Sequence, residues 1–258
     1  MSAPLLQLDR VTIRFGGLTA VSELTLNVGA DELIGLIGPN GAGKTTAFNL
    51  ITGVYQPTGG AIQFNGRPTA KLKPYELTKL GIARTFQNIR LFASMSVFDN
   101  VRAAVQLHRS HGIANALWRG RGFREGEQAV AAQVMELLDV FKLGEFRDAD
   151  AKSLPYGAQR RLEIVRALAT QPKLLLLDEP AAGMNPTEKV ELMKTIQFVK
   201  DKFRIAVLLV EHDMQVVMGI CQRIAVLDYG VKIAEGSPQE IRSNPKVIEA
   251  YLGEPKAA

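Results

Sequence analysis

The spacing of apolar residues along the chain predicts an α/β protein. Near the N-terminus, apolar and polar positions alternate over residues 5–15 and 24–28, which is typical of β-strands. Later segments change between short apolar runs and helical periodicity. We expect strands at 33–37, 174–178 and 204–211, helices at 46–51, 186–201 and 214–221, and a β-hairpin with arms at 224–227 and 231–234. Strands that alternate with helices predict a mostly parallel sheet covered on both faces.

The middle of the chain has a different pattern. Helical periodicity extends over residues 74–160 and is clearest at 127–140, where Val130, Val134, Leu137 and Leu138 share a helix face. This pattern predicts a helical subdomain inserted between two halves of the α/β core. We therefore expect a first core part at residues 1–86, the helical subdomain at 87–160, a second core part at 161–236 and a helical tail at 237–258.

A glycine-rich segment follows the first strand of the core. Its residues are Gly38, Pro39, Asn40, Gly41, Ala42, Gly43, Lys44 and Thr45, followed by Thr46 in the expected helix. They match the phosphate-binding loop G-x-x-x-x-G-K-[ST], in the strand–loop–helix context that this motif needs. Backbone N–H groups and the helix N-terminus would bind phosphates, Lys44 would reach the β- and γ-phosphates, and the Thr45 hydroxyl would ligate Mg²⁺. The sequence therefore predicts a nucleoside triphosphate site.

Two carboxylates end the expected strand at 174–178. At the end of a central strand, Asp178 can hold Mg²⁺ through water, and Glu179 can polarise a water that attacks the γ-phosphate. Taken alone, four leucines and two acids fit any buried strand. The phosphate-binding loop upstream favours the catalytic interpretation.

Composition changes this picture little. The chain is 47% hydrophobic and 22% charged, which is ordinary for a globular protein. Its longest apolar runs are too short to span a bilayer, and its first residues lack the pattern of a signal peptide. The single cysteine, Cys221, excludes an internal disulfide framework, and we expect a buried thiol there.

Positive charge gathers between Arg102 and Arg124, where there are five arginines, two histidines and no Asp or Glu. Such a segment can face anionic lipid headgroups, nucleic acid or an acidic partner, or it can be a solvated surface. Trp118 and Phe123 favour a membrane surface or a partner slightly.

These motifs, in this order, resemble the ATP-binding subunits of ABC transporters over nearly the whole chain. The resemblance implies a RecA-like P-loop ATPase core with an N-terminal antiparallel β segment and an inserted α-helical subdomain. Gln87 matches the glutamine that approaches Mg²⁺ and the attacking water, and His212 matches the switch histidine that contacts the γ-phosphate. Phe15 matches the aromatic residue that stacks on adenine. The family signature, which closes over the ATP of a second subunit, corresponds to a segment that includes Pro155, Tyr156, Gly157 and Ala158.

The chain departs from the general family at two places. Pro155 replaces the signature serine, so a hydroxyl and a backbone N–H are both lost as phosphate ligands. The contact then falls to Gly157 and to the dipole of a helix that we expect to begin near Ala158. Asn185 replaces an aspartate in the loop after Glu179, which bears on communication across a dimer interface.

These departures, together with the segments at 15–21, 84–92, 180–186 and 244–253, resemble the branched-chain amino-acid importer branch, and within it the larger ATPase subunit. The resemblance implies ATP and Mg²⁺ as cofactors, a second ATPase subunit that is identical or related, permease subunits and a periplasmic binding protein. It also implies a peripheral position at the cytoplasmic face of a bacterial inner membrane. Two alternatives stay open: a motor for lipid or lipopolysaccharide traffic, and a soluble ABC ATPase without a transport function.

Attachment to a membrane would then depend on a protein partner. We expect the docking surface at residues 87–98, where Ile89, Leu91, Phe92 and Met95 are apolar beside Arg90. The alternative is that these apolar side chains pack inside the subdomain.

Overall fold

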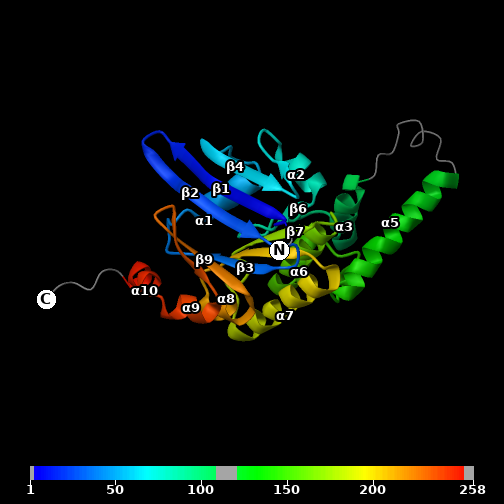
Figure 1. Cartoon of the computed structure of the whole chain (residues 1–258). Coiled ribbons are helices and arrows are strands. Elements are labelled where there is room, and N and C mark those ends of the chain that lie inside the picture. The colour runs from blue at the N-terminus through cyan, green and yellow to red at the C-terminus, as the bar shows by residue number, and fades with distance from the viewer. Residues whose placement is uncertain (1–2, 109–120, 253–258) are drawn as a thin grey trace. The chain divides into compact units, whose positions relative to one another are not determined.

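The computed structural model describes residues 3–108 and 121–252 (Figure 1). The chain forms two compact units. The first contains Met1–Leu77 and Lys173–Ala258, and the second contains Thr78–Pro172.

An antiparallel sheet forms the first part of the first unit. It contains β1 (Leu6–Phe15), β2 (Leu18–Val28), β4 (Gly59–Phe64) and β5 (Arg67–Pro68), in the order β2-β1-β4-β5. The predicted antiparallel segment is thus confirmed, but β2 begins at Leu18 rather than at residue 24. Pairing of Phe15 with Leu18 closes a tight turn, and the exposed start of β2 has no regular apolar alternation that could reveal it.

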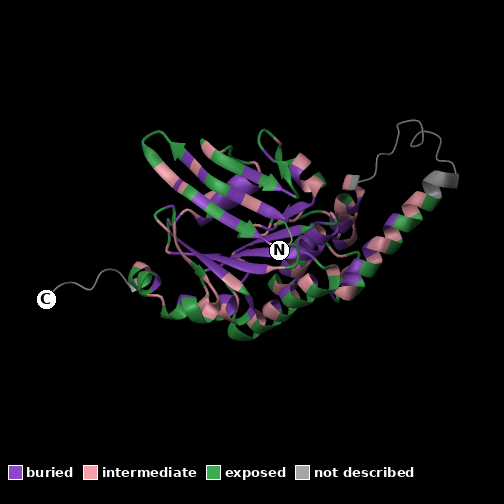
Figure 2. Cartoon of the chain, viewed as in Figure 1, coloured by how far each residue is buried: buried purple, intermediate pink, exposed green. Residues whose placement is uncertain are grey.

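A mostly parallel sheet follows. It contains β3 (Leu33–Ile37), β7 (Leu174–Asp178), β8 (Ala206–Val210), β9 (Arg223–Asp228) and β10 (Val231–Gly236), in the order β10-β9-β3-β8-β7. Strands β3, β7, β8 and β9 run parallel, and β10 is antiparallel to β9. Every residue of β3, β7 and β8 is buried, which is why these strands are apolar runs, apart from Asp178 at the end of β7 (Figure 2).

The helices of the first unit are α1 (Lys44–Ile51), α7 (Pro186–Phe203), α8 (Met214–Ile220), α9 (Pro238–Ser243) and α10 (Pro245–Leu252), with α2 (Pro74–Leu80) at the boundary. The predicted strand start at residue 204 is wrong. Arg204 has a left-handed backbone (φ 49°) and donates its N–H to the Lys200 carbonyl, so it ends α7. The strand begins two residues later, at Ala206.

The second unit is mainly helical. It contains β6 (Ile82–Arg84), α3 (Val97–Val105), α5 (Arg121–Val140) and α6 (Tyr156–Leu168), with 3₁₀ turns at Gln106–His108, Gly144–Phe146 and Ala151–Ser153. Helices α3, α5 and α6 pack together, and the predicted α5 face is confirmed because Val130, Val134, Leu137 and Leu138 are all buried. The helical prediction fails at β6, since an apolar run this short carries no usable periodicity.

The thiol of Cys221 and the hydropathy of the helices relate to two of the sequence predictions. Cys221 is a free, buried thiol, and burial raises its pKa to about 12. Within residues 3–108 and 121–252, no helix combines the length and the hydropathy that crossing a membrane requires. Arg109, His111, Trp118 and Arg119 lie outside the described residues, as do the side chains of His108, Arg121, Phe123 and Arg124.

Candidate nucleotide-binding site

The phosphate-binding loop joins the buried end of β3 to α1. Gly43, the residue before α1, has φ 98°, and a Cβ there would lie 2.6 Å from the Ala20 carbonyl oxygen. Gly38 has φ 151°, and its Cβ would meet the Leu227 carbonyl oxygen at 2.1 Å. Neighbouring strands therefore press on the loop at both ends, and only glycine fits at these two positions.

Lys44 is folded back along this loop. Its Nζ donates to the Gly38 carbonyl at 2.7 Å and to the Pro39 carbonyl at 2.9 Å. Burial lowers the pKa of Lys44, while the charges of Glu179 and Asp178 act in the opposite direction. The ammonium group is thus held at the loop and close to two carboxylates.

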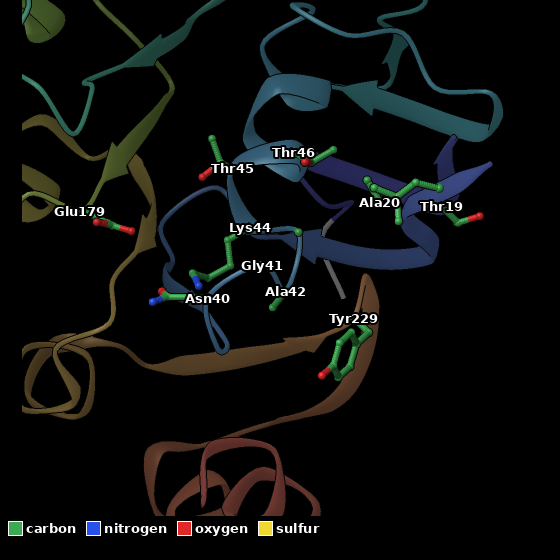
Figure 3. A pocket seen from close by; sticks show the side chains of 12 residues that line it. Thr19, Ala20, Asn40, Gly41, Ala42, Lys44, Thr45, Thr46, Glu179 and Tyr229 are labelled. Carbon is green, nitrogen blue, oxygen red and sulfur yellow. The ribbon is translucent and has the colours of Figure 1, made fainter. Parts of the chain in front are cut away.

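The loop lines a cavity of about 570 Å³. The lining residues are Leu18, Thr19, Ala20, Asn40, Gly41, Ala42, Gly43, Lys44, Thr45, Thr46, Glu179 and Tyr229. Figure 3 shows Glu179 at one end of the cavity and Thr19 and Tyr229 at the other, with the loop between them. The cavity therefore combines a phosphate-binding loop with a carboxylate that can act on a bound phosphate.

Glu179 follows directly after β7. Its backbone is left-handed (φ 44°), and its N–H donates to the Val210 carbonyl at 2.8 Å. This conformation directs the partly exposed carboxylate into the cavity, whereas Asp178, the preceding residue, is 95% buried. His212 lies nearby, since its Nδ1 is 3.6 Å from a Glu179 carboxylate oxygen.

Glu211, for which the sequence predicted no role, is fully buried beside these residues. Its carboxylate accepts hydrogen bonds from Ala181 N at 2.6 Å and His212 N at 3.1 Å, and burial is the main cause of its raised pKa. Glu211 thus joins the loop after β7 to the loop after β8, which carry Glu179 and His212. Its position before His212 was the only signal in the sequence, and it says nothing about the contact with Ala181.

The donor atoms at this site suit a hard cation. Three residues are expected to hold Mg²⁺: Thr45, which lines the cavity, Asp178, a carboxylate at the end of β7, and Gln87, which belongs to the second unit. Oxygen donors of this kind, completed by phosphate oxygens and water, are what Mg²⁺ prefers. No cluster of three or more His, Cys, Asp or Glu that could hold a metal occurs in the described part of the chain, so the phosphates themselves would have to contribute ligands.

In the second unit, the segment that carries Gln87 is attached to the signature helix α6. Arg160 is 1% exposed and donates to the carbonyls of Phe86 at 2.7 Å and Gln87 at 2.8 Å. Glu163 pairs with Arg160 at 2.8 Å and accepts from Phe86 N at 3.2 Å and Arg90 N at 3.4 Å. This buried ion pair, which the sequence analysis missed, fixes the backbone around Gln87.

Removing one member of this pair should strongly destabilise the protein. We expect Arg160→Met to lower the free energy of unfolding by about 3–5 kcal/mol, because Glu163 would stay buried without its cation. The double variant Arg160→Met/Glu163→Leu should recover most of the loss, since a well-packed apolar pair can replace a buried ion pair. Denaturant unfolding measures all three proteins. Arg147→Met, at a half-exposed arginine, is the control, and a loss no larger than in this control would contradict the assignment.

The signature segment forms the start of α6. Pro155 is the N-cap residue, Tyr156 begins the helix and is 42% exposed, and Ala158 is buried. The helix therefore starts two residues earlier than expected, and Gly157 lies in its first turn. The Arg160 guanidinium donates to the Tyr156 hydroxyl at 3.3 Å. Within its own subunit, the bulky Tyr156 side chain therefore binds the buried arginine.

Two other predicted residues have local contacts. Phe15 is 44% exposed and packs edge-on against Tyr55, with 5.2 Å between ring centroids; it does not line the cavity. Asn185 caps α7 in a capping box with Glu188, since its side chain accepts from Glu188 N at 3.0 Å. The roles of these residues toward nucleotide or a second subunit stay predictions.

Comparison with known proteins identifies the family of the chain. The model of the family described as "ABC transporter" matches residues 21–182. The chain belongs to the ABC transporter family. A second model, "Branched-chain amino acid ATP-binding cassette transporter", matches residues 231–257, so the chain falls in that branch of the family, and the recognition made from sequence is confirmed.

Individual relatives support the same assignment. The high-affinity branched-chain amino acid transport ATP-binding protein BraF of Pseudomonas aeruginosa is 44% identical over 254 residues, covering 98% of this chain and 100% of BraF. The lipopolysaccharide export system ATP-binding protein LptB of Escherichia coli is 33% identical over 240 residues, covering 93% of both chains.

Solved structures confirm the fold. The ADP conformation of MJ1267, an ATP-binding cassette of an ABC transporter, matches with a TM-score of 0.84 and 30% identity, covering 98% of this chain and 100% of MJ1267. A dimeric post-hydrolysis state of the ATP-binding cassette MJ0796 bound to ADP and Pi matches with a TM-score of 0.74 and 25% identity. The match covers 90% of this chain and 98% of the MJ0796 chain. The RecA-like P-loop ATPase core with an inserted helical subdomain is therefore correct, and the chain is an ATPase of this family.

Proposed function

We propose that this chain is the ATP-hydrolysing subunit of an importer for branched-chain amino acids or related solutes. The observation that carries the proposal is the cavity in which the phosphate-binding loop and Glu179 line the same space. The choice of substrate class is supported by the similarity to BraF, which exceeds that to LptB, and by the match at residues 231–257.

The chemistry follows from the positions of the side chains. The loop and Lys44 bind the phosphates, and Glu179 accepts a proton from the water that attacks the γ-phosphorus. His212, next to Glu179, would contact the γ-phosphate, and Gln87 would contribute to holding the metal and the attacking water. Thr45, Asp178 and Gln87 would hold Mg²⁺, which would supply neutralisation of phosphate charge.

A second cassette completes the site. The α6 N-terminus of one chain would close over the phosphates in another, so that Pro155 to Ala158 act in trans through backbone N–H groups and the helix dipole. The dimeric state of MJ0796 supports this arrangement. ATP turnover that depends on protein concentration, and uptake of labelled leucine by vesicles that contain the permease, test the proposal; uptake of an unrelated solute class alone would reject the substrate assignment.

A groove in the second unit offers a docking surface for the permease. It measures about 620 Å³, and its lining residues are Thr78, Ala83, Arg84, Arg90, Leu91, Phe92, Ala103, Ala104, Glu163, Arg166, Ala167 and Thr170. Phe92 is 52% exposed, and Arg166 lies over its ring at 5.4 Å. Its apolar and arginine side chains fit a short partner segment that is apolar with acidic residues.

Exposure of the four apolar side chains expected to dock favours docking over core packing. Ile89, Leu91 and Met95 are only half-buried, and Phe92 is exposed, so none of the four belongs to the core. This supports the docking interpretation. Part of the neighbouring basic segment is already neutralised, because Arg102 pairs with Glu127 and Asp99.

Phe92→Asp should abolish docking without unfolding the chain. The backbone of Phe92 is held by the buried Asn100, which accepts from Phe92 N at 2.9 Å and donates to its carbonyl at 3.1 Å, so only the exposed ring is lost. Sedimentation with permease-containing membranes should fall to the level seen without permease, while ATP binding persists. Phe198→Asp, at an exposed ring on α7, is the control. Normal sedimentation of Phe92→Asp would place the docking surface elsewhere.

This docking also explains how a chain whose described helices do not cross a membrane can work at one. We propose a peripheral position on the cytoplasmic face of the inner membrane, held by the permease.

A further inference from the structure

The turn between β9 and β10 has an unusual aromatic residue. Asp228 pairs with Val231, which leaves Tyr229 and Gly230 as a two-residue turn. Both have positive φ, 44° and 80°, as a type I′ turn requires. Asparagine or aspartate is favoured at the first position, because a bulky side chain in the left-handed region is strained. The chain thus keeps a tyrosine where folding alone would favour a smaller residue.

This turn is fixed to the phosphate-binding loop. Gly230 N donates to the Ala42 carbonyl at 3.0 Å, and the Gly230 carbonyl accepts from Ser22 N at 2.8 Å. A Cβ on Gly230 would lie 2.7 Å from the Ala20 carbonyl oxygen, so the packing is tight. The position of Tyr229 relative to the loop is therefore set by its neighbours.

Burial of the Tyr229 side chain does not contribute to the stability of the fold. The side chain is 87% exposed, yet it lines the cavity together with Leu18, which is 67% exposed. Two exposed apolar side chains at one rim of a binding cavity indicate a surface that a ligand covers. Strained backbone at such a place is typical of functional positions.

The arrangement of the cavity indicates which part of a ligand this rim would meet. Glu179 lies at one end, where it can act on the terminal phosphate, and Tyr229 lies at the other end, beyond the loop (Figure 3). A nucleotide with its γ-phosphate near Glu179 and its phosphates on the loop extends its ribose and base toward the Tyr229 rim. Phe15 does not line this cavity.

We propose that Tyr229 is a contact residue for the ribose and base of bound ATP, and that its ring packs on them against Leu18. The proposal rests on ATP binding in this cavity, and it adds a contact that the phosphate-binding motif does not include. A π-face suits a planar base, and the contact is tolerant of which base is present.

The test compares ATP with inorganic tripolyphosphate, which has the phosphates but no ribose or base. Tyr229→Asn removes the ring and suits the left-handed turn, so it should fold at least as stably as the wild type. It should weaken ATP binding by about 5- to 50-fold, in the range of base–aromatic contacts. Tyr229→Phe should stay within about two-fold of wild type if the ring carries the contact. Tripolyphosphate affinity should be unchanged in both variants.

Calorimetric titration of the full chain with Mg²⁺ present measures these affinities, with Val231→Ala as the control in the same hairpin but outside the cavity. Unchanged ATP affinity in Tyr229→Asn overturns the proposal. An equal loss for tripolyphosphate also overturns it, because Tyr229 would then act through the loop. A defect confined to dimer formation overturns it in favour of a contact between two chains. Failure of ATP to bind the wild-type protein would instead reject the proposed nucleotide site.

Discussion

Glu179→Gln should reduce ATP hydrolysis by about 10²- to 10⁴-fold, the range expected when a general base is removed. The amide keeps the shape of the side chain but cannot accept the proton of the attacking water. The backbone of Glu179 is held by Val210 and its side chain is only 19% exposed, so the replacement should stay in place. ATP binding should persist, and an ATP-bound dimer should accumulate.

The measurement is steady-state phosphate release with the partner subunits present, together with gel filtration in ATP. Glu191→Gln, at an exposed glutamate on α7, controls for the loss of one negative charge. Turnover within a few-fold of the wild type would remove Glu179 from the role of base and direct attention to His212.

Lys44→Ala should weaken ATP binding by about 10- to 100-fold, because a charge-assisted hydrogen bond to phosphate contributes about 1.5–3 kcal/mol. The ammonium group is already directed along the loop by the carbonyls of Gly38 and Pro39. Its burial means that no other cation can easily take its place. Fluorescence titration with a labelled ATP analogue gives the dissociation constants.

Lys246→Ala, at an exposed lysine on α10, is the matched control for this titration. Because Lys44 also binds two loop carbonyls, thermal unfolding without nucleotide should accompany the titration. A folded Lys44→Ala protein with wild-type affinity for ATP would show that the nucleotide does not bind on this loop.

The sequence predicted the core of this fold well, for a physical reason. Strands such as β3, β7 and β8 are buried on both faces, and burial of that kind demands continuous apolar runs that can be read directly. The elements that were missed or shifted are those at the surface or those of very few residues. β2 begins in exposed positions and β6 has only three residues, so neither carries a reliable period.

The sequence by itself determined the parts of the site that are local in the chain. The loop from Gly38 to Thr45 is one contiguous segment, and the acids Asp178 and Glu179 at the end of β7 are adjacent. The chemistry of each segment can therefore be predicted from the spacing of its residues in the sequence. The roles of Gln87, of Phe15 and of Pro155 to Ala158 came from resemblance and stay predictions.

Only the tertiary structure decided which distant residues contact the individual segments predicted to carry functional residues. Glu211 binds Ala181 N across 30 positions, Arg160 binds the Phe86 carbonyl across 74, and Tyr229 reaches the phosphate-binding loop from a hairpin near the end of the core. Each of these side chains is ordinary in sequence, since a glutamate, an arginine or a tyrosine in such segments is most often solvated. They become functional candidates because folding brings them to particular backbone groups or to the cavity. Neither hydrophobic periodicity nor a short motif can predict contacts between residues so far apart in the sequence.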